Sequence, residues 1–161
     1  RIPAGLLKMY LHVSPEELFE VWQHTMLGHL QANAIGYNGH FANGITAIFI
    51  ACGQDVANVA NSAVGITNFE ILEDGDLYAS VTLPSLSVAT VGGGTGLGTS
   101  RECLEMLGCS GSGNAVKLSE IVAASLLAGE LSMGAAIASG EFVHAHERYG
   151  RNRPQPVRDG E

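Results

Sequence analysis

Apolar positions recur at helical spacing in several parts of the chain, and most of these parts carry their own start or stop signals. The first begins after Ser14, where Ser-Pro-Glu-Glu provides an N-cap, a proline at the first helical position and a capping box closed by Glu17. In residues 42–52, apolar side chains fall at i, i+3, i+4 and i+7, and Gly53 is a suitable stop. These patterns predict two helices.

The longest apolar run, residues 115–149, is also predicted to be helical. Asn114 precedes this run and is a suitable N-cap. Gly129 and Gly140 are expected to divide it, because glycine weakens the interior of a helix.

A shorter helix is predicted before this long run. Thr99 and Glu102 have the spacing of a second capping box, so we expect the helix to begin after Thr99. Gly108 is the expected stop.

Two segments have the alternating pattern of half-buried strands. Residues 65–72 and 77–83 flank an Asp-Gly turn, which favours an antiparallel hairpin, and residues 85–91 are a candidate third strand. The predicted fold class is therefore α+β, dominated by helices, with a small antiparallel sheet. Residues 1–150 are expected to form one folded unit, and the polar, proline-containing residues 151–161 are expected to be a disordered tail.

Composition narrows the possible partners. The chain has 161 residues, of which 46% are hydrophobic, and a formal net charge of −8. This charge argues against a nucleic-acid surface and against a general attraction to anionic membranes. Three cysteines without a CxxC pair predict neither a disulfide framework nor a zinc site, and they favour a reducing, cytoplasmic location. Because the chain begins with Arg1 rather than Met, we expect further sequence before it.

Residues 121–139 have the length and apolar character of a membrane span. Glu130 and Gly129 interrupt this segment, and no aromatic or cationic anchors flank it. We therefore predict a buried helix of small residues and no membrane segment.

The glycine-rich stretch LSVATVGGGTGLGTS, residues 86–100, calls for a separate explanation. It matches neither the Rossmann fingerprint nor the P-loop, because the P-loop lysine is replaced by Thr99. Two interpretations stay open from composition. In one, a ligand approaches the bare backbone of Gly92, Gly93 and Gly94, beside the Thr95 hydroxyl and a helix N-terminus. In the other, the stretch is a structural turn.

Two titratable side chains are candidates for chemistry. Asp55 follows a helix stop, where it can cap a short helix, and its functional role would be that of a buried carboxylate beside a cation or another acid. His146 falls near the end of the last predicted helix, where a histidine also interacts favourably with the helix terminus. The other histidines, His24, His29 and His40 among them, show no convincing metal-binding geometry, and no metal is expected.

Three long segments and a closing histidine occur in an order that resembles hydroxymethylglutaryl-CoA reductase, in its class I catalytic domain and more closely in the soluble bacterial or archaeal forms. The resemblance extends from Ile2 to about Arg151 and implies that residues 1–150 are the C-terminal part of the large, substrate-binding domain. Its segments are NGHFANGITAIFIACGQD, DLYASVTLPSLSVATVGGGT, EIVAASLLAGELSMGAAIASG and the closing histidine.

The resemblance implies the reduction of hydroxymethylglutaryl-CoA to mevalonate and CoA with two NADPH, a reaction of the mevalonate pathway of isoprenoid biosynthesis. It also implies a homodimer or larger homo-oligomer with active sites at subunit interfaces. Asp55 matches the catalytic aspartate, His146 matches the histidine that protonates the departing thiolate, and Asn43 matches a substrate-contacting asparagine. The second NADP-binding motif of the family is matched by Val91, Gly92, Gly93, Gly94 and Thr95.

The chain also departs from the family pattern. The family's catalytic lysine, catalytic glutamate and first NADP-binding motif are expected before Arg1, so residues 1–161 alone are expected to be inactive. His24 aligns with the lysine that binds the free carboxylate of the substrate. Two alternatives therefore stay open: a non-catalytic CoA-binding or assembly module that has kept the fold, and a different acyl-CoA enzyme on a related scaffold.

Overall fold

The computed structural model describes residues 1–150, and the predicted disorder of residues 151–161 lies outside this part of the chain. The α+β prediction is confirmed: helices dominate, and the described residues contain one sheet of two antiparallel strands. The elements in chain order are α1 (Ala4–Leu6), η1 (Leu7–Leu11), α2 (Pro15–Gln31), α3 (Phe41–Ala51), η2 (Val56–Asn58), α4 (Val59–Ser62), β1 (Ile66–Ile71), β2 (Leu77–Thr82), η3 (Gly93–Gly96), α5 (Gly98–Met106), α6 (Ala115–Ala138) and α7 (Glu141–Tyr149).

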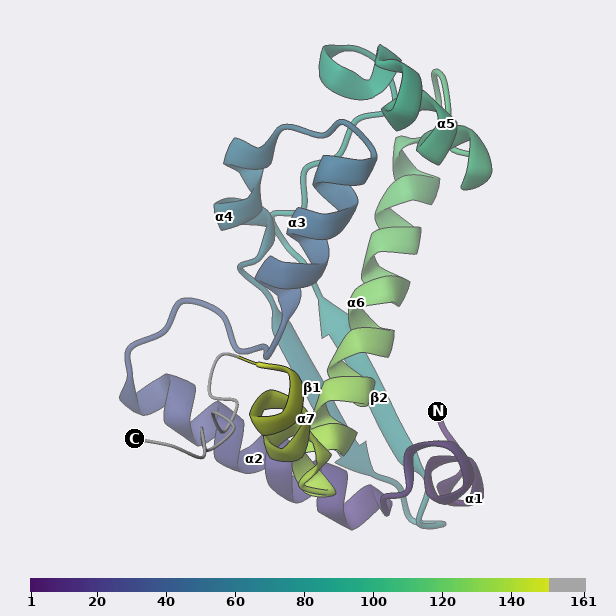
Figure 1. Ribbon diagram of the computed structural model, residues 1–161. Helices are drawn as coiled ribbons and strands as arrows, with labels where there is room; N and C mark the ends of the chain where they lie inside the picture. The colour runs from purple at the N-terminus through teal and green to yellow at the C-terminus, as the bar shows by residue number, and fades with distance from the viewer. Residues whose placement is uncertain (151–161) are drawn as a thin grey trace, which may run out of the picture.

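Helix α6 runs along most of the molecule and organises the rest (Figure 1). It packs against α2, α3 and β2, with α5 near its N-terminal end and α7 directly after its C-terminal end. By its length and composition alone, α6 could also cross a membrane, but a single helix of this kind is weak evidence for a membrane protein. Its buried residues, among them Leu118, Val122 and Leu126, are those of a core helix.

The predicted start of α2 is confirmed in detail. The Glu17 backbone N–H donates to Ser14 Oγ at 3.2 Å, and the Ser14 N–H donates to Glu17 Oε2 at 2.7 Å. This reciprocal pair satisfies two N–H groups that a helix terminus otherwise leaves unbonded. Pro15 occupies the first helical position, where its missing N–H costs nothing.

The hairpin is also confirmed, with Phe69 opposite Ala79 and Gly75 at φ +84° in the turn. The predicted third strand at residues 85–91 is wrong, because these residues pair with no strand. Side chains satisfy part of their backbone instead: the Ser87 N–H donates to Ser62 Oγ at 3.2 Å, and the Ala89 N–H donates to Gln54 Oε1 at 2.7 Å. The segment is therefore irregular, and side chains bond its backbone outside the sheet.

Only one of the two predicted helix breaks occurs. Gly140, at φ +77°, separates α6 from α7, whereas α6 continues through Gly129. A Cβ atom at Gly129 would overlap the imidazole ring of His40, which packs against this position. Gly129 therefore serves close packing and does not end the helix.

The predicted capping at α5 and α6 also needs correction. Helix α5 starts at Gly98 with Leu97 as its N-cap, so the proposed box of Thr99 and Glu102 does not form. Asn114 is at the N-cap position of α6 as predicted, but its amide donates to the carbonyls of Ser110 and Gly111 and does not cap the helix.

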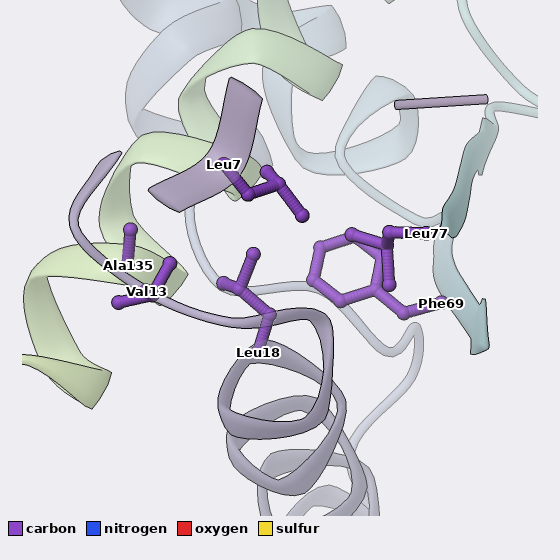
Figure 2. Close-up of a cluster of buried hydrophobic side chains, with 6 residues drawn as sticks. All are labelled: Leu7, Val13, Leu18, Phe69, Leu77 and Ala135. Carbon is purple, nitrogen blue, oxygen red and sulfur yellow. The ribbon is translucent and has the colours of Figure 1, made fainter. Parts of the chain in front are cut away.

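The core divides into clusters along α6. Figure 2 shows the one at the α2 end, where residues of η1, the segment after it, α2, the hairpin and α6 converge, namely Leu7, Val13, Leu18, Phe69, Leu77 and Ala135. A second cluster joins α3 to α6 through Phe41, Ile45 and Phe49. This second cluster fixes the helix whose C-terminal end leads into Asp55.

Candidate functional site

The candidate residues of two separate motifs line one hollow of about 700 Å³. The end of α3 and the turn after it form one wall, and the extended residues before η3 form the other. The sequence candidates that it brings together are Asp55, Val91, Gly92, Gly93, Gly94 and Thr95.

Asp55 reaches this hollow because α3 ends just before it. Gly53 has φ +64°, a left-handed conformation that turns the chain out of the helix. Asp55 then caps η2 as predicted, since the Ala57 N–H donates to Asp55 Oδ1 at 3.0 Å. Within residues 1–150, Oδ2 accepts no hydrogen bond and no cation is paired with this exposed carboxylate. One oxygen is therefore structural, and the other is available to a ligand.

The glycines of the stretch divide into two kinds. Gly92 and Gly93 have φ +85° and +55°, and a Cβ atom added at either would meet nothing within 4 Å. Gly94 differs, because a Cβ atom there would lie 2.9 Å from the carbonyl oxygen of Gly53. Each interpretation left open by the sequence therefore applies to part of the motif: Gly94 packs against the protein, and Gly92 and Gly93 present bare backbone to the hollow.

Thr95 is a buried residue that stabilises the glycine loop. It is 7% exposed, and its hydroxyl donates to the Gly92 carbonyl at 2.6 Å. The hydroxyl proton is therefore engaged within the loop, whereas the sequence suggested that the hydroxyl would face a ligand. The side chain stabilises the conformation of Gly92 and Gly93.

Asn43 does not line the hollow but lies on the face of α3 that leads to it. It is exposed in the first turn of the helix, seven residues before Ile50, which does line the hollow. Positions i and i+7 share one helix face about 10 Å apart along the axis. A long ligand seated in the hollow can therefore reach Asn43.

His146 is separate from these groups within one chain. It is exposed on α7, its Nδ1 bonds to the Phe142 carbonyl at 2.7 Å, and the two rings pack with centroids 4.2 Å apart. It does not line the hollow. Helix α7 follows the C-terminal end of α6 (Figure 1), and the 24 residues of α6 correspond to a length of about 36 Å. A single copy of the chain does not bring His146 to Asp55.

Glu130 is a residue whose role the sequence did not reveal. It is only 6% exposed, and its carboxylate accepts bonds from Gly39 N–H at 3.0 Å, His40 N–H at 2.7 Å and the Thr67 hydroxyl at 2.8 Å. It thus holds the loop before α3 against α6, at the floor of a second, apolar hollow of about 260 Å³. Its position inside an apolar run was the signal that could have identified it.

The three cysteines belong to a different part of the core. Cys52, Cys103 and Cys109 are free thiols that pack around one core cluster. Burial, together with the two neighbouring thiols, raises the pKa of Cys52. Among residues 1–150, no group of three or more His, Cys, Asp or Glu side chains is placed to hold a metal ion.

Comparison with known proteins gives a consistent result. A family model described as hydroxymethylglutaryl-coenzyme A reductase matches residues 1–151. The 3-hydroxy-3-methylglutaryl-coenzyme A reductase of Pyrococcus horikoshii is 46% identical over 156 residues, which are 93% of this chain and 38% of the relative. The enzyme of that name from Methanocaldococcus jannaschii is 48% identical over 88% of this chain and 35% of its own length, and that of Xenopus laevis is 43% identical over 94% and 18%. The chain thus spans little more than a third of its archaeal relatives.

Proposed function

Because the chain belongs to the hydroxymethylglutaryl-coenzyme A reductase family, we propose that it forms part of an oxidoreductase that reduces hydroxymethylglutaryl-CoA to mevalonate and CoA. The observation that carries this proposal is the shared hollow, into which both Asp55 and the bare backbone of Gly92 and Gly93 open. The proposal assigns residues 1–150 to the large domain of that enzyme. Since the chain spans 38% of the Pyrococcus relative, we propose that turnover requires residues from the remainder.

The residues of the hollow fit a nicotinamide dinucleotide, and we propose NADPH. Gly92 and Gly93 leave room for a ligand to lie against their main chain, because no protein atom would meet a Cβ there. Leu97 and Ser100 extend the lining to the start of α5, where no side chain caps the helix, and a helix N-terminus favours negatively charged groups. When bound, this cofactor supplies the hydride.

We propose that Asp55 controls protons at the reacting carbonyl. Its Oδ1 is fixed by the Ala57 N–H, which holds the side chain in one orientation. Its Oδ2 has no partner within residues 1–150, so it can accept a hydrogen bond from another catalytic group or from the substrate. A positioned carboxylate of this kind contributes typically about 100- to 10,000-fold to the rate of a proton transfer.

We propose that His146 protonates the CoA thiolate as it leaves. Nδ1 is bonded to the Phe142 carbonyl, so Nε2 is the nitrogen that can deliver a proton to a partner. A free imidazolium is about two pKa units more acidic than a free thiol, which makes the transfer of its proton to a thiolate, leaving neutral imidazole, favourable by roughly 2.7 kcal/mol. Protonation prevents the thiolate from attacking the aldehyde again.

For His146 to protonate a thiolate at the hollow, a second copy of the chain is required. Asp55 and His146 are distant within one copy, so we propose a homo-oligomer in which a partner completes the site. Support comes from large apolar side chains exposed along several elements, including Met9, Tyr10, Leu30, Ile35 and Ile50, since unpartnered apolar surface commonly marks an interface. A cytoplasmic location is part of the same proposal and is supported by the three unpaired thiols.

A ligand titration of the complete gene product tests the function. We expect it to bind both NADPH and hydroxymethylglutaryl-CoA and to oxidise NADPH only when both are present. Binding of acyl-CoA without NADPH would favour the alternative of a non-catalytic CoA-binding module. Such a module is compatible with the exposed His24, which stands on α2 in place of the carboxylate-binding lysine of the family.

A further inference from the structure

Side chains from other parts of the chain hold the residues that lead into the glycine loop: Ser62 bonds Ser87, and Gln54 bonds both backbone groups of Ala89. Gln54 Oε1 accepts from the Ala89 N–H at 2.7 Å, and Gln54 Nε2 donates to the Ala89 carbonyl at 2.8 Å. The same Nε2 donates to the Cys52 carbonyl at 3.0 Å. A side-chain amide that bonds both backbone groups of one residue replaces the neighbouring strand that residues 85–91 lack.

Two consecutive residues therefore fasten both ends of the open backbone. Gln54 holds Ala89, three residues before Gly92, and Gly53 is in main-chain contact with Gly94. The residues between these two attachment points include Gly92 and Gly93, whose surroundings are open. Thr90, just after Ala89, is also attached, because its hydroxyl donates to the Gly111 carbonyl at 2.7 Å. Because Asp55 directly follows Gln54, the same pair of attachments sets the distance across the hollow from the carboxylate to the glycine backbone.

We propose that Gln54 is a positioning residue that pre-orders the glycine loop for the cofactor. The inference rests on the proposed function for the identity of the ligand, although the ordering itself is a property of the free protein. Glycine loses more conformational freedom than any other residue when it is fixed. A loop already fixed at both ends avoids much of this entropic cost when a ligand binds, so loss of the attachment weakens binding without removing a ligand contact.

Two variants separate this role from general stabilisation. Gln54→Met keeps the length of the side chain and removes its hydrogen bonds to Ala89 and Cys52. Ser62→Ala is the matched control, because Ser62 bonds the same extended segment at Ser87 but does not line the hollow. Hydrogen–deuterium exchange of residues 89–96 in the ligand-free protein reports the ordering of the loop. Titrations of the complete gene product with NADPH and with hydroxymethylglutaryl-CoA report affinity.

For Gln54→Met we expect faster exchange over residues 89–94 and NADPH binding weakened about tenfold, which corresponds to about 1.4 kcal/mol of ordering cost added to the binding step. Binding of hydroxymethylglutaryl-CoA should stay within about twofold of wild type. Ser62→Ala should lower the melting temperature without a selective effect on NADPH. Gln54→Glu, which keeps the acceptor for the Ala89 N–H, should show an intermediate effect and provides the comparison if the Met variant does not fold.

Unchanged exchange in both Gln54 variants would overturn the inference, as would equal weakening of both ligands or the same selective effect in Ser62→Ala. A wild-type protein that binds no NADPH would instead overturn the proposed function. The exchange measurement on the free protein would then still decide whether Gln54 orders the loop.

Discussion

Gly53 and Gly94 are in direct main-chain contact: a Cβ atom added at Gly94 would lie 2.9 Å from the carbonyl oxygen of Gly53, and one added at Gly53 would overlap the carbonyl of Gly94. The two residues are 41 positions apart and belong to separate motifs. Their contact places the turn that carries Asp55 beside the glycine loop. Glycine is required at Gly53 for a second reason, since its φ is +64°.

The substitution Gly53→Ala should therefore both destabilise the chain and disturb the hollow. The new methyl group would meet backbone atoms of Gly94, which cannot rotate away, and the left-handed conformation adds about 1–2 kcal/mol. We expect the free energy of unfolding to fall by at least about 2 kcal/mol, as measured by urea denaturation.

Gly96→Ala is the matched control for this change. It lies in the same loop, and a Cβ atom there would meet nothing within 4 Å. Its effect should stay within about 0.5 kcal/mol. Equal losses in the two variants would mean that the loop is sensitive to any side chain and that the contact with Gly53 is not the cause.

Features of the fold that depend on neighbouring residues were predictable from the sequence. The capping box of Ser14 and Glu17 and the break at Gly140 are local events, so their signals lie within a few residues. The packing role of Gly129 was not predictable, because the His40 ring that leaves no room for a side chain there comes from a distant loop.

The candidate site likewise combines features that the sequence could predict with features that depend on distant residues. The resemblance identified Asp55 and the glycine motif, and the structure places them at one hollow. The sequence could not show that Gln54 substitutes for a missing strand, because its partner Ala89 is 35 residues away. Nor could it show that one chain leaves His146 apart from Asp55, since that separation depends on the length and direction of α6.

The substitution Asp55→Asn should separate the two roles of this residue. Asparagine is as good an N-cap as aspartate, so the bond from the Ala57 N–H is kept and the melting temperature should hardly change. Turnover of NADPH by the complete gene product should fall at least about 100-fold, because an amide cannot exchange a proton. Asp55→Ala should additionally lose about 1 kcal/mol of stability. Full activity in Asp55→Asn would limit the residue to capping.

Among substitutions in α6, Glu130→Ala should be one of the most destabilising. It removes the acceptor for the N–H groups of Gly39 and His40 and for the buried hydroxyl of Thr67, and we expect a loss of about 3 kcal/mol in urea denaturation. Glu120→Ala, at an exposed position of the same helix, should change stability by no more than about 0.5 kcal/mol. Similar values for the two variants would show that the Glu130 network adds nothing.

The Asp76 carboxylate makes stability depend on pH. A hydrogen bond from the Ala4 N–H and the interaction with Arg1 lower its pKa below the ordinary value. A lowered folded-state pKa means that the stabilisation is present above about pH 4 and disappears as the pH falls through the folded-state value. The stability difference between wild type and Asp76→Asn should therefore be largest near neutral pH and vanish in acid. Glu73→Gln, an exposed neighbour, should show no such dependence.

His146→Gln should affect one half of the reaction. The side chain is exposed and its ring is bonded only to the Phe142 carbonyl within α7, so the variant should fold as stably as wild type. Reduction of hydroxymethylglutaryl-CoA should slow about 100-fold, because the departing thiolate loses its proton donor. Reduction of the free aldehyde, added to the same protein, involves no thiolate and should continue at nearly the wild-type rate.

His144→Gln is the control for this comparison, since His144 is exposed two residues away on the same helix and lies on a different face. It should leave both rates unchanged. If His146→Gln slowed the two substrates equally, the histidine would be acting on cofactor binding or on assembly of the oligomer, because only a role at the thiolate distinguishes a thioester from an aldehyde. If it slowed neither, the proton would have to come from another group, and the need for a partner copy to bring His146 to the hollow would disappear with it.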